Sequence, residues 1–199
     1  MKNLIMTINK RRVIIIWIII IAAYFAINRY SSSPSFGADM RYSEAFARFQ
    51  KAREQKERWY ALSDLAKESF HTGRFDEAQR YADELDKLTP TYQDNWNYGN
   101  AIQDANIVHG LLALRAGDRM AAKQHLTSAG ASPGSPQMNS FGPNMCLARA
   151  LLRVGERDAV LAYFEQCRRF WDFHGSDLDH WRFMVSWGIT PDFGANLVY

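Results

Sequence analysis

The residues that come nearest to a metal-binding pattern in this sequence are the histidines and acids around residue 177. The metal-competent side chains there are His174, Asp177, Asp179 and His180, in a turn and the start of a helix. No HExxH spacing, which would place two histidines on one helical face, occurs among the five histidines. An aspartate near a helix N-terminus is also favoured by the helix dipole without any metal. We therefore expect no metal site.

Nucleophile and cofactor motifs are absent from the sequence. GxSxG, the P-loop and GxGxxG do not occur. The two cysteines, Cys146 and Cys167, form no CxxC pair for zinc or redox chemistry. They are either two semi-buried thiols in helices or one disulfide, and the sequence leaves both open. We expect no catalytic residue, no cofactor and a protein that is not an enzyme.

Two segments that separate the predicted helical repeats, here called the two insertions, carry aromatic and amide side chains of the kind that line saccharide or peptide sites. They span residues 92–100 and 128–144, and the second holds three glycines and three prolines. Long loops within a compact array of helices are usually functional or disordered. The aromatic content of these two segments argues against disorder. The candidate loop-site residues are Trp96, Tyr98, Asn100, Asn139, Phe141 and Asn144. If they form one site, the two insertions must meet in space, which would make a small-ligand or saccharide-binding protein, or an enzyme, the alternative function.

The formal net charge of +3 arises from the N-terminal segment. Its basic residues are Lys2, Lys10, Arg11, Arg12 and Arg29, with no acid among them. Removing these five from the 24 basic residues leaves 19 against 21 acidic ones, a net charge of −2. Nucleic-acid binding normally requires a basic stripe that replaces counterions. We expect no nucleic-acid partner.

An uninterrupted apolar stretch follows the first basic residues. Residues 13–27 read VIIIWIIIIAAYFAI, and residues 13–29 are predicted to form one transmembrane anchor in a lipid bilayer. A cleaved signal peptide shares this pattern, but the candidate cleavage sites lack a small residue at −3. The basic excess before the stretch predicts that residues 1–12 are cytoplasmic. Residues 30–199 would then lie outside the inner or plasma membrane, which is the periplasm if the source is a Gram-negative bacterium.

The rest of the chain has the apolar period of helices. A short Ser-rich and Pro-containing linker covers residues 30–39. From residue 40 to residue 199 apolar side chains recur at spacings of three and four, and no strand-like alternation occurs. We expect an all-α domain over residues 40–199.

One stretch has the spacing of a paired-helix repeat. Its motif residues are Ala66, Gly73, Phe75, Ala78 and Pro90. The small residues allow close helix packing, Gly73 permits the left-handed conformation that ends a helix, and Pro90 cannot continue one. The chain thus resembles tetratricopeptide-repeat proteins. Ser69 departs from the motif, because a large aromatic is usual there.

Two weaker copies surround Gly117 and Gly155. The turn glycines are 44 and 38 residues apart, against about 34 in the family, so the copies carry insertions. The resemblance predicts about three divergent repeats at residues 59–91, 103–130 and 143–172, closed by a C-terminal cap over 173–199. Residues 58–199 also resemble an uncharacterised bacterial family of TPR-like proteins, from which no functional residue is carried over.

The repeat resemblance also predicts a partner groove. In tetratricopeptide arrays the first helix of each repeat lines the concave face, which here points to Tyr60, Lys67, Phe70, His71, Arg115, Arg149 and Arg153. An acidic segment or a free C-terminal carboxylate would suit such a groove. The same positions are alternatively ordinary exposed helix residues. We expect a membrane-anchored module for protein–protein interaction or scaffolding, with an unidentified protein or peptide partner.

Overall fold

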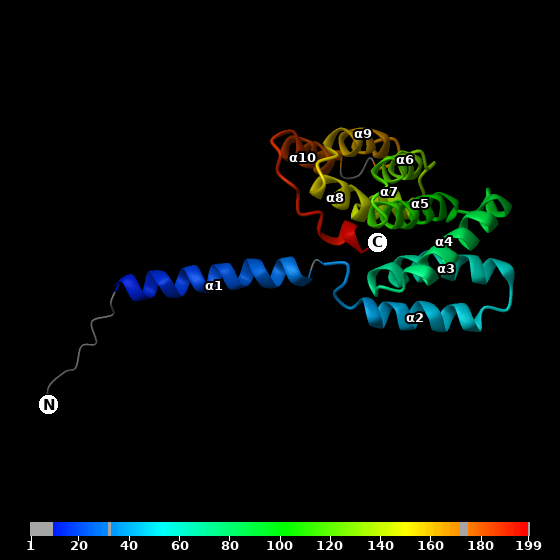
Figure 1. The fold of residues 1–199 in the computed structure, drawn as a ribbon, viewed down its shortest axis with the longest axis horizontal. Coiled ribbons are helices and arrows are strands. Elements are labelled where there is room, and N and C mark those ends of the chain that lie inside the picture. The colour runs from blue at the N-terminus through cyan, green and yellow to red at the C-terminus, as the bar shows by residue number, and fades with distance from the viewer. Residues whose placement is uncertain (1–9, 32, 172–174, 199) are drawn as a thin grey trace, which may run out of the picture.

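The computed structural model describes residues 10–31, 33–171 and 175–198, and these residues form α-helices and short 3-10 helices with no strand (Figure 1). The α-helices are α1 (Lys10–Ser31), α2 (Ala38–Lys51), α3 (Gln55–His71), α4 (Phe75–Leu88), α5 (Tyr98–Arg115), α6 (Arg119–Gly130), α7 (Pro136–Phe141), α8 (Cys146–Arg153), α9 (Arg157–Cys167) and α10 (Gly175–Ser186). The 3-10 helices are η1 (Thr89–Tyr92) and η2 (Gly194–Leu197). The predicted all-α class is therefore confirmed.

Helix α1 projects from the other helices as a separate rod (Figure 1). Every side chain from Ile14 to Ile21 is between 50% and 60% exposed. Among the residues that the structure describes, no helix has both the length and the apolar character needed to cross a membrane. The structure thus lends no support to the transmembrane anchor predicted at residues 13–29. Most of the cytoplasmic segment predicted at residues 1–12 lies outside the described residues.

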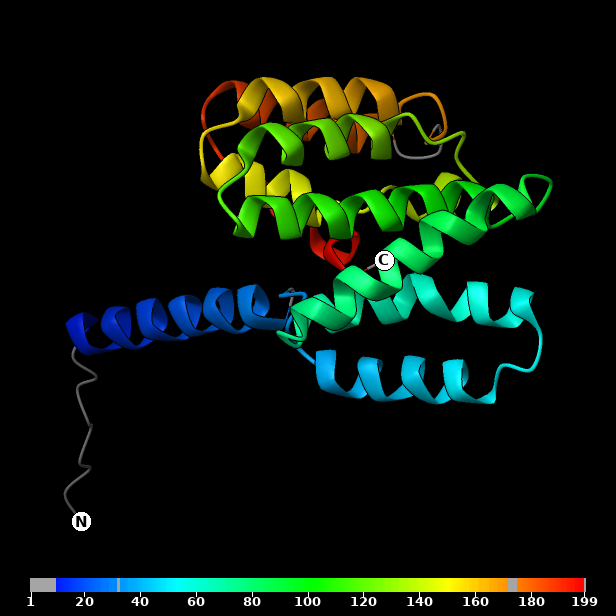
Figure 2. The same cartoon turned by 45° about the vertical axis from the view of Figure 1, so that its right-hand side comes forward.

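Three helical hairpins make up most of the remaining fold. The pairs are α3 with α4, α5 with α6, and α8 with α9. The first helices of successive hairpins pack side by side, because α5 contacts both α3 and α8 (Figure 2). Helix α2 packs on α3 at one end of the array, and α10 packs on α9 at the other. These hairpins span residues 55–88, 98–130 and 146–167, and so overlap the predicted repeat ranges 59–91, 103–130 and 143–172. The tetratricopeptide assignment itself stays a prediction.

The same turn ends the first helix of each hairpin. Gly73, Gly117 and Gly155 have φ values of 79°, 87° and 88°. Each glycine N–H donates to the carbonyl three residues earlier at 3.1 Å, and the following N–H donates to the carbonyl five residues before it. This is the Schellman arrangement, in which a left-handed glycine satisfies the last carbonyls of a helix. The left-handed conformation expected at Gly73 is confirmed.

The C-terminal part covers the end of the array. Trp181 of α10 is buried against Phe193, with ring centroids 4.9 Å apart in an edge-to-face arrangement. The tail then returns to α8, where the Met145 N–H donates to the Asn196 carbonyl at 2.7 Å. The predicted cap range, 173–199, includes residues 173, 174 and 199, which lie outside the described residues.

The two insertions are more ordered than their composition suggests. The first holds part of η1 and the start of α5, and the second holds the end of α6 and all of α7. Ser135 begins α7 as a side-chain cap, since its hydroxyl accepts from the Met138 N–H at 2.9 Å.

Candidate functional site

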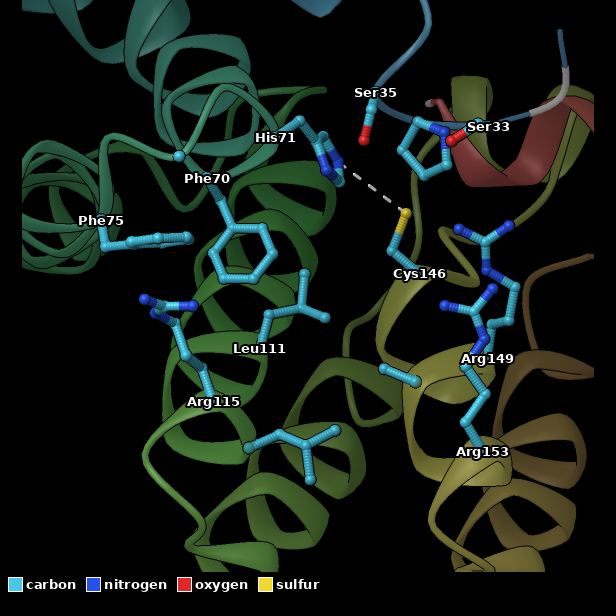
Figure 3. A pocket seen from close by; sticks show the side chains of 14 residues that line it. Ser33, Ser35, Phe70, His71, Phe75, Leu111, Arg115, Cys146, Arg149 and Arg153 are labelled. Carbon is cyan, nitrogen blue, oxygen red and sulfur yellow. Dashed lines mark hydrogen bonds between the residues drawn. The ribbon is translucent and has the colours of Figure 1, made fainter. Parts of the chain in front are cut away.

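A cavity of about 990 Å³ opens where α3, α5 and α8 meet the segment that joins α1 to α2 (Figure 3). We call it the arginine cavity. It is lined by Ser33, Pro34, Ser35, Phe70, His71, Gly73, Phe75, Leu111, Leu114, Arg115, Cys146, Arg149, Ala150 and Arg153. Five of the seven predicted groove residues are in this set: Phe70, His71, Arg115, Arg149 and Arg153.

Basic side chains reach the arginine cavity from equivalent positions in the three hairpins. His71, Arg115 and Arg153 are the last residues of α3, α5 and α8. Each stands two residues before a left-handed turn glycine. At Arg115 and Arg153 the positive charge is favoured, because the C-terminal end of a helix carries partial negative charge. The repeated turn therefore gathers these residues at one end of the three neighbouring helices.

Among the residues that the structure describes, no acidic side chain lines the arginine cavity. Arg149 lies one helical turn before Arg153, and Figure 3 shows both across the cavity from Arg115. The Arg115 guanidinium stacks over the Phe75 ring, 3.7 Å from its centroid. Within the described part of the chain, neither Arg115 nor Arg153 forms an ion pair. The cavity therefore presents positive charge that favours an anion.

His71 is uncharged in the free protein at neutral pH. Burial lowers its pKa to about 4, and the nearby cations Arg41, Lys67 and Arg149 act in the same direction. Both effects disfavour a proton on the imidazole. An anion placed near Arg149 would oppose the cationic contribution, so His71 would bind a proton more readily when the cavity is filled.

Cys146 and His71 are close but do not form an activated nucleophile. The Cys146 Sγ lies 3.9 Å from His71 Nε2, and the thiol donates instead to the Leu197 carbonyl at 2.9 Å. Burial raises the pKa of Cys146 to about 12, so the thiol stays protonated at neutral pH.

Cys146 and Cys167 are both free and buried, which decides against the disulfide that the sequence left open.

The segment before α2 forms a wall of the arginine cavity. Arg41 of α2 holds this segment by donating to the Pro34 carbonyl and, at 2.6 Å, to the Phe36 carbonyl. Its Nε also pairs with the Glu68 carboxylate of α3 at 2.7 Å. Arg41 thereby fixes the path of the chain between α1 and the array.

A second, smaller cavity of about 200 Å³ lies between α3, α5 and α7. We call it the insertion cavity, because both insertions contribute to it. It is lined by Tyr60, Ser63, Asp64, Lys67, Trp96, Asn97, Asn100, Gln103, Asp104, Gln137, Met138, Phe141 and Gly142. No residue lines both cavities. The two remaining groove residues, Tyr60 and Lys67, and three loop-site residues, Trp96, Asn100 and Phe141, lie here.

Direct hydrogen bonds hold the two insertions together. Asn100 donates to Gln137 at 2.7 Å and accepts from the Ser135 hydroxyl at 2.6 Å. The Ser132 hydroxyl donates to the Gly99 carbonyl at 2.7 Å in a buried contact. The two insertions thus meet in space, as a shared loop site requires.

A buried ion pair lies in the wall of the insertion cavity. The Lys67 ammonium is 3.1 Å from the Asp104 carboxylate and 3.6 Å from Asp64. Lys67 and Asp104 are 8% and 6% exposed. Burial alone would lower the pKa of Lys67, but the two carboxylates raise it overall, so Lys67 is charged.

The other loop-site residues do not line the insertion cavity. Asn144 is buried, and its side chain accepts from the Cys146 N–H at the start of α8. Its backbone N–H donates to Gln103 and its carbonyl accepts from the Tyr163 hydroxyl, each at 2.9 Å. Tyr98 and Asn139 are half-buried, on α5 and α7. Asn144 is therefore structural.

The sequence prediction missed the contribution of the linker and of Phe75 to the arginine cavity. The sequence predicts residues 33–35 only as part of a linker and Phe75 only as a repeat-motif residue, but all four line the arginine cavity. The length of the linker gives no signal for its path, and Phe75 has no aromatic counterpart two positions after Gly117 or Gly155, where Arg119 and Arg157 stand. In the residues that the structure describes, no group of three or more metal-competent side chains could hold a metal ion. His174, from the sequence cluster, lies outside these residues.

Comparison with protein-family models, with curated proteins and with solved structures finds no match to this chain.

Proposed function

We propose that this protein is a tetratricopeptide-like interaction module that binds an acidic protein segment in the arginine cavity. The observation that carries the proposal is a large cavity lined by Arg115, Arg149 and Arg153, with no acidic side chain among the described residues of its lining. Each arginine presents a planar fork of donors that matches a carboxylate. A volume of about 990 Å³ admits several residues of an extended peptide rather than a single small anion.

The apolar wall of the cavity supplies a second kind of contact. Phe70, Phe75, Leu111 and Leu114 line the same space as the arginines. A segment that alternates acidic and apolar side chains would satisfy both. Burying its apolar side chains contributes about 25 cal/mol per Å² of apolar area removed from water.

The equivalence of the three hairpins supports the tetratricopeptide assignment. His71, Arg115 and Arg153 share one position relative to the turn glycine, as repeats of one structural unit would. The first helices α3, α5 and α8 line the cavity, which is where arrays of this kind bind their partners. This argument is one of architecture, and the arginine chemistry is what defines the ligand.

We further propose that α1 attaches the module to a membrane, with the helical array on the extracytoplasmic side. Eight consecutive large apolar side chains of α1, Ile14 to Ile21, are at least half exposed. Such a surface is costly in water and is covered in a lipid environment. Carbonate extraction of cell membranes tests this proposal: the full chain should stay in the pellet, and Ile16→Asp with Ile20→Asp should release it. Release of the unaltered chain would refute membrane attachment.

Photo-crosslinking in intact cells tests the acidic partner. A benzophenone side chain replaces Leu114, which lines the arginine cavity, and Met120 serves as the control position because it is 70% exposed on α6 outside the cavity. We expect an adduct at position 114 only, mapping to an acidic segment and lost with Arg149→Glu plus Arg153→Glu. An adduct that persists after this charge reversal would contradict the proposal.

A further inference from the structure

The insertion cavity has a chemistry different from that of the arginine cavity. Its charged lining residues are Asp64, Lys67 and Asp104. Lys67 pairs with both carboxylates, and Asp64 also pairs with Arg48 at 2.6 Å. These charges therefore compensate one another, and the cavity does not select an anion.

Aromatic side chains line the insertion cavity from α3, from the connection between η1 and α5, and from α7. Trp96 is 55% exposed and Phe141 is 53% exposed, although both are large and apolar. The Trp96 ring stacks on Tyr60 of α3, with centroids 6.0 Å apart and an interplanar angle of 28°. Exposed aromatics beside a polar hollow are typical of a surface that a ligand covers.

Amides and carboxylates occupy the deeper wall of the insertion cavity. Asn97, Asn100 and Gln103 are 6%, 9% and 3% exposed, and all three line it. Asn100 is held in place by three hydrogen bonds, because it also donates to Asn97 at 2.8 Å. These bonds use both Asn100 N–H groups, so Asn100 can offer a ligand hydroxyl only its oxygen, whereas the amide nitrogen of Asn97 donates in none of them. A fixed set of amide donors and acceptors can recognise neighbouring hydroxyls of one ligand.

The size of the insertion cavity restricts the ligand further. Its volume of about 200 Å³ is below the 300–1,000 Å³ of sites for drug-sized ligands. One sugar ring fits this space, with further rings extending over the exposed aromatics. A sugar ring offers an apolar C–H face for stacking on an aromatic ring and hydroxyls at its edge for amides and carboxylates.

We propose that the insertion cavity is a binding site for one ring of an uncharged saccharide. The Trp96 ring, which itself stacks on Tyr60, packs on its apolar face. The buried amides, with Asp64 and Asp104, bind its hydroxyls. The site is separate from the arginine cavity, so a saccharide and a protein segment can be held together on one module.

Saturation-transfer NMR with the full chain in a non-glycosidic detergent tests this site. The probes are glucose, galactose, N-acetylglucosamine and the β-1,4-linked dimer of N-acetylglucosamine, with glycine and acetate as non-sugar probes. We expect saturation transfer to at least one sugar, with a dissociation constant raised at least tenfold by Trp96→Ala and far less by Trp96→Phe. Trp187→Ala is the matched control, because Trp187 is 72% exposed and lines neither cavity.

A second variant separates binding from folding. Gln137→Ala removes one amide that lines the insertion cavity, on the exposed side of α7. It also removes the acceptor of the 2.7 Å hydrogen bond from Asn100, so it should weaken sugar binding and lower the melting midpoint only slightly, with a cooperative transition retained. Saturation transfer to no sugar, an unchanged dissociation constant in Trp96→Ala, or binding of glycine or acetate in place of sugars would each overturn the proposal. Arg149→Glu with Arg153→Glu should leave sugar binding intact, so its result is independent of the protein-segment proposal.

Discussion

Replacing Gly99 by alanine should separate the two insertions. Gly99 lies within α5, where alanine is normally the better helix former. A Cβ at this position would lie 2.0 Å from the carbonyl oxygen of Gly134, whereas ordinary contact begins at 3.4 Å. The Gly134 backbone must therefore retreat by about 1.4 Å, which the two distances imply.

The expected loss of stability follows from the contacts between the insertions. Three hydrogen bonds join them, from Ser132 to the Gly99 carbonyl, from Ser135 to Asn100 and from Asn100 to Gln137. Each contributes about 1 kcal/mol, so their loss costs about 3 kcal/mol. The higher helix propensity of alanine offsets about 1 kcal/mol of this loss in the free energy of unfolding. The net expectation is a free energy of unfolding lower by about 2 kcal/mol.

Urea unfolding of the full chain in detergent, followed by circular dichroism, measures this difference. With a slope of about 2 kcal/mol per M, the midpoint should fall by about 1 M. Gly175→Ala is the control, because a Cβ at the first residue of α10 would contact nothing within 4 Å. If Gly99→Ala instead stabilises the protein by about 1 kcal/mol, as helix propensity alone predicts, the docking of the insertions is refuted.

Two further predictions concern buried titratable groups. Because folding lowers the pKa of His71 from 6.5 to about 4, the unfolded chain binds more protons between these values, and stability falls as pH drops through this window. His71→Gln should remove about 2 kcal/mol of the difference in unfolding free energy between pH 7 and pH 4.5, and an unchanged difference would contradict the assignment. Lys67→Met leaves Asp104 buried without its cation and should cost about 3–5 kcal/mol in urea unfolding. Adding Asp104→Leu should recover most of this loss, and failure to recover it would show that packing, not charge, dominates there.

Sequence patterns that involve only neighbouring residues predict much of the fold. The left-handed turns at Gly73, Gly117 and Gly155 follow from glycine at a helix end, and all three have φ near +80° to +90°. The apolar period likewise predicted the helices, because burial at spacings of three and four places one face toward the core. The short helix α7 was not predicted, since its start depends on Pro136 and on the Ser135 cap rather than on any apolar period.

The sequence predicts the residues that line the candidate sites better than it predicts their separation into two cavities. Tyr60, Lys67 and His71 lie on one stripe of α3, at spacings of seven and four residues. The structure splits this stripe, with His71 at the arginine cavity and the other two at the insertion cavity. The split arises from contacts between segments far apart in sequence, such as Asn100 with Gln137, which no periodicity encodes.

The measurement that tests the central claim most directly is the affinity of an acidic peptide for the arginine cavity. A fluorescent peptide of alternating Glu and Leu is titrated with the full chain and followed by anisotropy. We predict a dissociation constant at least tenfold weaker for Arg149→Glu with Arg153→Glu, because each lost charged contact is worth about 1.5–3 kcal/mol. Arg53→Glu is the control, since Arg53 is exposed just before α3, at the end of that helix opposite His71. Equal affinity in the double variant and the unaltered protein would contradict the claim.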